Sequence, residues 1–98
     1  MYKADSNKVA YNNCFGGFSL SEKAESRLVE LGVLKENIPY LNRHDLRLIQ
    51  VIEELKNEAN SRFSYLKIET ILGNKYRIDE YDGLESVQTP DDIDWIEI

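Results

Sequence analysis

Two adjacent glycines, Gly16 and Gly17, constrain the fold most strongly, because they interrupt a strand pattern and a helix pattern follows them. Residues 8–14 include Val9 and Tyr11, which suit a sheet, and the glycines predict the end of that strand. Apolar residues then recur at helical spacing, namely Leu20, Ala24, Leu28 and Leu31. Residues 11–21 therefore predict a strand, a glycine loop and the start of a helix in succession.

Polar residues and glycine mark the ends of this first helix. Ser19 and Glu22 have the spacing of a capping box, Ser21 is a competing N-cap, and Gly32 is placed to end the helix. Pro39 lies in the following connection, residues 33–40, and predicts that no helix forms there.

A second helix is predicted after Asp45, which suits an N-cap. Its buried face consists of apolar residues, namely Leu48, Ile49, Ile52, Leu55 and Ala59. Because crossover connections are right-handed, we expect the strands before and after the helices to lie parallel, with both helices on one face. The other face then needs a second subunit, a ligand or the C-terminal tail, which favours a homo-oligomer.

Short strands are predicted in the last third of the chain. Residues 65–71 alternate as a half-buried strand does, Gly73 and Asn74 predict a tight turn, and residues 76–79 follow as its hairpin partner. Asp82 and Gly83 mark another turn. The expected order is β-α-α-β-β, with or without a terminal strand at 94–98. This is an α+β domain, a two-layer α/β arrangement with a small mixed sheet of three or four strands.

The charge of the chain is concentrated at one end. The 98 residues predict a single domain, 1–98, with a globular core at 7–88 and an acidic tail or edge strand at 89–98. The net charge is −6, and residues 79–98 hold eight acidic residues but no Lys or Arg. This argues against direct nucleic-acid binding, which needs cations to displace counterions. Three interpretations remain: an acidic surface for a basic protein partner, mimicry of DNA, or a tail that keeps the protein soluble.

The cellular location follows from what the sequence lacks. The single cysteine, Cys14, cannot form an internal disulfide. Residues 1–20 have no apolar core of a secretory signal, and no apolar run reaches the roughly 20 residues that span a bilayer. We therefore expect a cytoplasmic protein with no membrane partner.

The glycine loop is the first candidate binding site. Its backbone N–H groups, with the start of the following helix, favour an anion, and the flanking phenylalanines could stack on a base. The predicted site residues here are Asn13, Cys14, Phe15, Gly16, Gly17 and Phe18. The alternative is a tight turn whose two phenylalanines fill the core.

Two polar segments could complete that site. Arg43 and His44 precede the second helix and could meet a phosphate, or they form a plain surface loop and cap. The acidic segment after a later strand contains Asp79, Tyr81 and Asp82. It could accept hydrogen bonds from a ribose or base, bind a cation or a partner's arginine, or be only an acidic turn. Neither cofactor nor metal is expected, because one His and one Cys form no zinc site and the calcium-loop pattern is missing.

Cys14 also allows a catalytic hypothesis. A thiol near a helix N-terminus is more easily ionised, and His44 is the one histidine that could act as its base. The alternative is a small apolar core residue.

Several motifs taken together resemble a family of short, uncharacterised phage and prophage proteins. Members read N-x-C-[YF]-G-G-F-x-L-S near the start and E-Y-D-G near the end. The resemblance covers roughly residues 8–87 and rests on residues 13–18 with Leu20 and Ser21, on 43–45, on 48–55 with 58–60, on 66–68, and on 78–83 with Glu85. It implies a phage context, in which small accessory proteins counter host defence by blocking a protein or sequestering a nucleotide signal.

Three functional hypotheses follow from the sequence. The first is a non-catalytic, homo-oligomeric protein that holds an anionic, nucleotide-like molecule at Gly16 and Gly17. The second is an inhibitor of a host defence protein that docks through residues 79–98, with Trp95 as an aromatic anchor. The third is an enzyme that uses Cys14.

Overall fold

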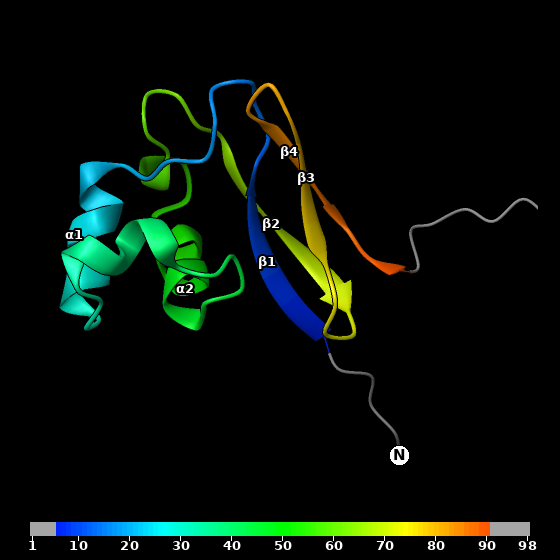
Figure 1. Ribbon diagram of the computed structural model, residues 1–98. Helices are drawn as coiled ribbons and strands as arrows, with labels where there is room; N and C mark the ends of the chain where they lie inside the picture. The colour runs from blue at the N-terminus through cyan, green and yellow to red at the C-terminus, as the bar shows by residue number, and fades with distance from the viewer. Residues whose placement is uncertain (1–5, 91–98) are drawn as a thin grey trace, which may run out of the picture.

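The computed structural model describes residues 6–90 and shows the predicted α+β class (Figure 1). Two α-helices, two short 3₁₀ helices (η) and four strands follow one another in the order β1 (Ser6–Asn12), α1 (Glu22–Glu30), η1 (Lys35–Tyr40), α2 (Leu46–Leu55), η2 (Lys56–Ala59), β2 (Leu66–Leu72), β3 (Arg77–Tyr81) and β4 (Leu84–Gln88). The predicted strand at 94–98 lies outside the described residues.

Strands β1 and β2 pair antiparallel, so the expected parallel arrangement is wrong. The reason lies in the connection, in which two helices carry the chain away from the end of β1 and back again (Figure 1). The Ser21 N–H before α1 donates to the Ala59 carbonyl after α2 at 2.9 Å, and Leu20 bridges to Asn60. The chain thus returns to the end of β1 it left, and β2 must run in the opposite direction.

Strand β3 pairs with β4, not with β2 as predicted. The predicted turn at Asp82 and Gly83 is confirmed, and it is the turn of this hairpin. Both residues have positive φ, 55° and 91°, as a two-residue hairpin loop of the Asp-Gly type requires. The described strands therefore form two separate two-stranded sheets, instead of one mixed sheet.

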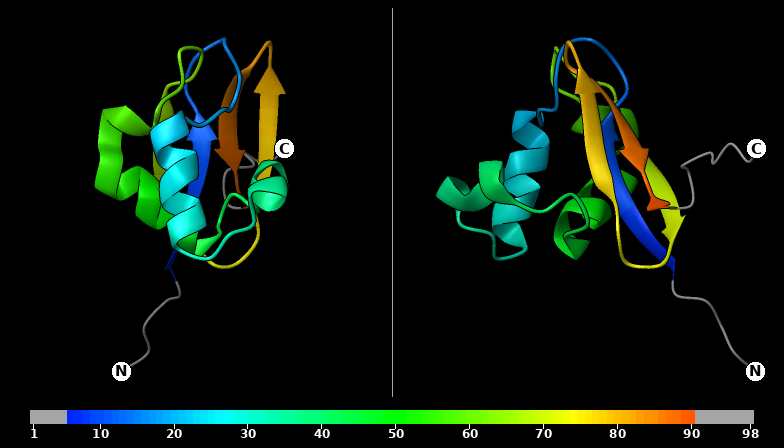
Figure 2. Two further views of the ribbon diagram at one scale, coloured as in Figure 1. Left: turned by 90° about the vertical axis from the view of Figure 1, so that its left-hand side faces the viewer. Right: turned by 45° about the vertical axis from the view of Figure 1, so that its right-hand side comes forward.

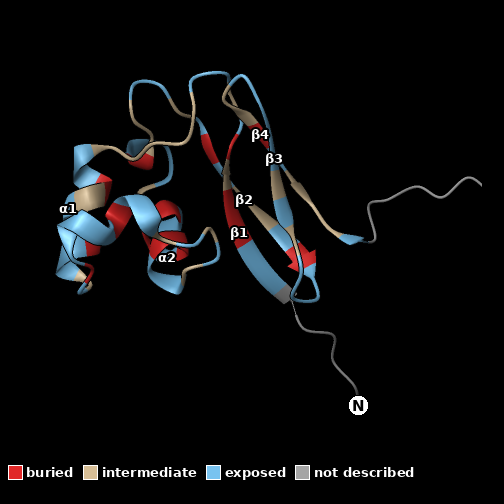
Figure 3. Cartoon of the chain, viewed as in Figure 1, coloured by how far each residue is buried: buried red, intermediate tan, exposed pale blue. Residues whose placement is uncertain are grey.

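The β3–β4 hairpin covers β1 on the side away from the helices, for which the sequence did not predict a single covering element. Val9 and Ala10 are both 0% exposed, although neighbouring residues of a strand point to opposite faces. Ala10 belongs to the core shared with the helices, which lie on one side of β1 and β2 as expected (Figure 3). β4 contacts β1, and the hairpin lies beside β1, away from the helices (Figures 1 and 2). Covering β1 therefore requires no second subunit, and the homo-oligomer stays a prediction.

The helix ends follow the local signals in most places. Ser21, not Ser19, is the N-cap of α1, and its hydroxyl accepts from the Ala24 N–H at 3.1 Å. Gly32 follows the helix with φ of 98°, as predicted. Residues 35–40 form the 3₁₀ helix η1 with Pro39 inside it, so the prediction of no helix was wrong. A 3₁₀ helix this short is held by few backbone hydrogen bonds, so it tolerates the one N–H donor that Pro39 lacks.

Replacing Asp45, the N-cap of α2, tests the second helix. Its carboxylate accepts from the backbone N–H of Arg47 at 2.8 Å and of Leu48 at 3.3 Å. Burial raises the pKa of Asp45, but hydrogen bonds from Arg47 and Leu48 outweigh it, so the net pKa lies below the ordinary 3.8. Asp45→Ala is expected to lower the unfolding free energy by about 1 kcal/mol near neutral pH, measured by urea unfolding.

The pH dependence of the stability lost in Asp45→Ala tests whether the ionised carboxylate is responsible. A lowered pKa in the folded state contributes stability above the unfolded pKa, and this contribution is lost as pH falls through the folded pKa. The difference between wild type and Asp45→Ala should therefore shrink below about pH 4. Asp45→Asn keeps an acceptor without the charge, so its difference from Asp45→Ala should not change with pH. A pH-independent cost of Asp45→Ala would contradict the role of the carboxylate.

Candidate functional site

Loops from three parts of the chain meet at one end of the molecule, uppermost in Figure 1. They are residues 13–19 after β1, residues 61–65 before β2, and the β3–β4 turn at 82–83, and we call their meeting point the apex. The apex contains most of the predicted site, namely Asn13, Cys14, Phe15, Gly16, Gly17, Phe18 and Asp82, with Tyr81 at the adjoining end of β3.

One buried side chain, that of Asn12, bonds to all of these loops. Asn12 is 0% exposed, and its Nδ2 donates to the carbonyls of Cys14 at 2.7 Å and Gly83 at 2.8 Å. Its Oδ1 accepts from the backbone N–H of Tyr65 at 2.8 Å. The residue predicted from the sequence was the neighbouring Asn13, which is exposed; Asn12 was not predicted. Strand alternation gives no signal that separates the two, because both faces of β1 are covered and Asn13 shares the face of Val9 and Tyr11.

The glycines of the apex allow its loops to touch. A Cβ atom on Gly16 would lie 1.8 Å from the Phe63 carbonyl oxygen, and one on Gly83 would lie 2.4 Å from that of Phe15. At Gly17 there is open space, and the glycine is favoured by its φ of 98°. The chain's own backbone therefore fills the space beside Gly16. The glycine loop is also separated from α1, which begins at Glu22 behind the Ser21 cap.

An ion pair between the partly exposed Arg43 and the buried Glu85 anchors the hairpin below the apex. The Arg43 guanidinium donates to both carboxylate oxygens of Glu85, at 2.6 and 3.0 Å, and Glu85 is 7% exposed. Glu85 Oε1 also accepts from the Asn12 N–H at 2.9 Å, while the Arg43 carbonyl accepts from the Ala10 N–H at 2.8 Å. The backbone N–H groups of Ala10 and Asn12 on the edge of β1 therefore donate to Arg43 and Glu85. In a continuous sheet, such N–H groups would donate to the backbone of the neighbouring strand.

Arg43 and Phe18 are stacked on one another. The Arg43 guanidinium carbon lies 3.7 Å from the centroid of the Phe18 ring, at the distance of a close cation–π contact. Phe18 is half-buried and Phe15 is exposed. The sequence left open whether these rings face a site or the core, and the structure separates them: Phe18 lies inside and Phe15 outside.

Exposed aromatic side chains project from all parts of the apex. Phe15 is 65% exposed, Phe63 is 64% exposed and Tyr81 is 78% exposed. Each comes from a different segment, and the backbone beside it is held by the glycine contacts or by a hydrogen bond to Asn12. Phe63 was not predicted; its only sequence signal is an aromatic residue in a polar loop.

The charges around the apex are predominantly acidic on the hairpin side. Glu80 and Asp82 are exposed and make no ion pair within residues 6–90, whereas Asp79 pairs with Arg77 at 3.3 Å. Arg62, beside Phe63, likewise has no ion-pair partner in the described part of the chain.

Cys14 and His44 make their hydrogen bonds with different groups. The Cys14 thiol donates to the Phe63 carbonyl at 3.3 Å and to Asn12 Oδ1 at 3.5 Å. His44 Nδ1 lies 2.7 Å from the Tyr76 hydroxyl, with the two rings edge to face. Within the described residues, the structure therefore shows no hydrogen bond that couples the thiol to the histidine.

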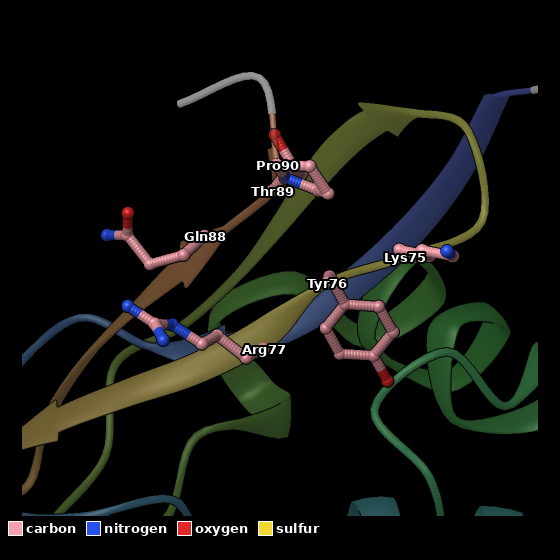
Figure 4. Close-up of a pocket in the computed structure, with 6 residues that line it drawn as sticks. All are labelled: Lys75, Tyr76, Arg77, Gln88, Thr89 and Pro90. Carbon is pink, nitrogen blue, oxygen red and sulfur yellow. The ribbon is translucent and has the colours of Figure 1, made fainter. Parts of the chain in front are cut away.

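A small hollow lies at the opposite end of the hairpin from the apex. It has a volume of about 240 Å³ and is lined by Lys75, Tyr76, Arg77, Gln88, Thr89 and Pro90 (Figure 4). It borders the end of the described chain and contains none of the predicted site residues. We assign it no role.

Comparisons with known proteins add no relative. No protein-family model, curated protein or solved structure matches this chain. No group of three or more His, Cys, Asp or Glu residues within 6–90 is placed to hold a metal ion. In the same part of the chain, no helix is long and apolar enough to cross a membrane.

Alanine substitutions at Gly16 and Gly17 test which part of the glycine loop is packed against neighbouring backbone. Gly16→Ala is expected to lower the unfolding free energy by about 3 kcal/mol, because its Cβ would clash with the Phe63 backbone. Gly17→Ala is expected to cost only about 1 kcal/mol, because it meets an unfavourable φ but no neighbour. Urea unfolding measures both, and equal costs would contradict the packing described here.

Removing Arg43 tests the buried ion pair. Arg43→Met should lower the unfolding free energy by about 3–5 kcal/mol, because it leaves the Glu85 carboxylate buried and unpaired. Adding Glu85→Gln should restore part of that loss, because the amide is neutral and its oxygen can still accept from the Asn12 N–H. As a control, Lys23→Met breaks an exposed pair with Glu58 and should cost under about 1 kcal/mol. A double variant less stable than Arg43→Met would contradict this account.

Proposed function

We propose that this protein is a non-catalytic binding module that recognises another protein through its apex. The observation that carries the proposal is the display of Phe15, Phe63 and Tyr81 on loops joined by the buried Asn12. Exposed aromatic residues gathered at one place commonly mark interaction surfaces, where they supply most of the binding energy.

The rigidity of the apex supports a binding role. A flexible loop loses conformational entropy when it binds, and this loss weakens the complex. Here the Gly16 and Gly83 contacts and the Asn12 hydrogen bonds fix the loop backbones before any partner arrives. Aromatic side chains add little further cost, because each has only two rotatable bonds.

The charge of the surrounding surface indicates the chemistry of the partner. Glu80 and Asp82 flank Tyr81 without ion-pair partners in the described chain, and the protein has a net charge of −6. A basic patch around an apolar cleft would complement this surface and speed the encounter. This agrees with the predicted acidic docking segment, of which the structure describes residues 79–90; Trp95 lies outside. The resemblance to phage proteins supplies the biological context, in which we propose a host defence protein as the partner.

The nucleotide-like ligand predicted at the glycine loop receives less support. Arg43, which was to meet a phosphate, already makes two hydrogen bonds to Glu85 and stacks on Phe18. The space beside Gly16 is filled by the Phe63 backbone. His44 Nδ1 forms a hydrogen bond with the Tyr76 hydroxyl. A second anion would therefore compete with contacts that the fold already uses.

Alanine substitutions at the apex test the proposal. The wild-type protein and the triple variant Phe15→Ala, Phe63→Ala, Tyr81→Ala are each immobilised and incubated with lysate of the natural host. Each protein that the wild type retains is then purified, and its affinity for the wild type and for the variants is measured by titration calorimetry. Each single substitution is expected to weaken binding about tenfold or more, because these rings carry the contact. Affinity should also fall as salt rises.

A matched control lies in η1, outside the apex. Tyr40 in η1 is 83% exposed, close to the 78% of Tyr81, so Tyr40→Ala removes an equally exposed ring away from the apex. This variant should bind as wild type does. Amide NMR spectra show that each variant remains folded. A partner that the triple variant binds as tightly as wild type does would overturn the proposal.

A further inference from the structure

A second hollow, separate from the apex surface, lies on the helix side of the molecule. It has a volume of about 340 Å³ and is bounded by α1, η1, the start of α2 and the segment at 18–20. Its floor includes the buried side chains of Ile38 and Leu48, and the half-buried Leu20 and Leu41 form its walls. This volume is within the lower range of pockets that bind small molecules.

Two charged side chains, Arg43 and Glu25, line this hollow, and only Arg43 has an oppositely charged partner in the described chain. The Arg43 charge is neutralised by Glu85 through two hydrogen bonds. Glu25 is partly buried and has no ion-pair partner within residues 6–90. Lys35 lines a neighbouring hollow together with Glu25 but forms no ion pair with it in the described chain. Glu25 lies in the first turn of α1, where the helix dipole stabilises its negative charge.

We propose that this hollow binds a small organic cation that consists of an apolar body and a primary ammonium group. The apolar body packs against Leu20, Ile38 and Leu48, where it removes apolar surface from water. The ammonium group forms a charge-assisted hydrogen bond with Glu25. An anion of the same shape is expected to bind more weakly, because it would meet the Glu25 carboxylate while the Arg43 charge is already balanced by Glu85.

The test uses two probes of similar shape and opposite charge, 2-phenylethylamine and 3-phenylpropionate. Each is titrated into the full chain and followed by amide NMR. The amine is expected to shift the signals of residues around Leu20, Ile38 and Leu48 in a saturable manner, and the acid is not. Glu25→Gln is nearly isosteric and should weaken amine binding about tenfold or more.

Glu22→Gln is the matched control, because it removes the same charge from the same helical turn at an exposed position that does not line the hollow. It should change amine affinity less than about twofold, since exposed charges are screened. Equal binding of amine and acid, no saturable shift up to about 10 mM amine, or an unchanged affinity in Glu25→Gln would each overturn the proposal. Phe63→Ala should bind the amine normally, which separates this site from the apex.

Discussion

The position of the β3–β4 hairpin depends on the ion pair between Arg43 and the buried Glu85. Adjacent strands are ordinarily joined by a backbone ladder, but here Arg43 and Glu85 bond to Ala10 and Asn12 on the β1 edge. Burying two charges costs solvation free energy, so such pairs are tolerated only where their remaining donors and acceptors have partners. Glu85 satisfies this condition through Arg43 and the Asn12 N–H. The pair therefore defines where the hairpin lies beside β1.

The apex follows from that placement. Once the hairpin is anchored beside β1, its Asp82–Gly83 turn reaches the loops at the end of β1 and the start of β2. Asn12 then finds backbone partners in each of them, and within residues 6–90 no buried side-chain polar atom lacks a hydrogen bond. A polar network satisfied in this way specifies one arrangement of the loops, because any shift would leave a buried group unpaired.

Local features of the fold were predictable from the sequence, and long-range ones were not. The cap at Asp45, the stop at Gly32 and the turn at 82–83 each depend on a few adjacent residues. Strand direction depends on where a two-helix connection ends, which local periodicity does not encode. The partner of β3 was misassigned because turns at 73–74 and 82–83 both resemble hairpin turns. Most of the predicted site residues lie together at the apex, but whether they form a site stays a prediction. The role of Glu85 was missed, because in the sequence it looks like one more solvated carboxylate in an acidic segment.

The hydrogen bonds that Asn12 makes to the loops have a consequence for how such a protein could diversify. Nearly all of them go to main-chain atoms: the carbonyls of Cys14 and Gly83 and the N–H of Tyr65. Every amino acid has the carbonyl, and every one except proline has the N–H, so Asn12 places little demand on the side chains that project from the loop tips. Substitutions at positions 15, 63 and 81 could therefore change which partner is recognised, while the backbone geometry of the loops stays the same.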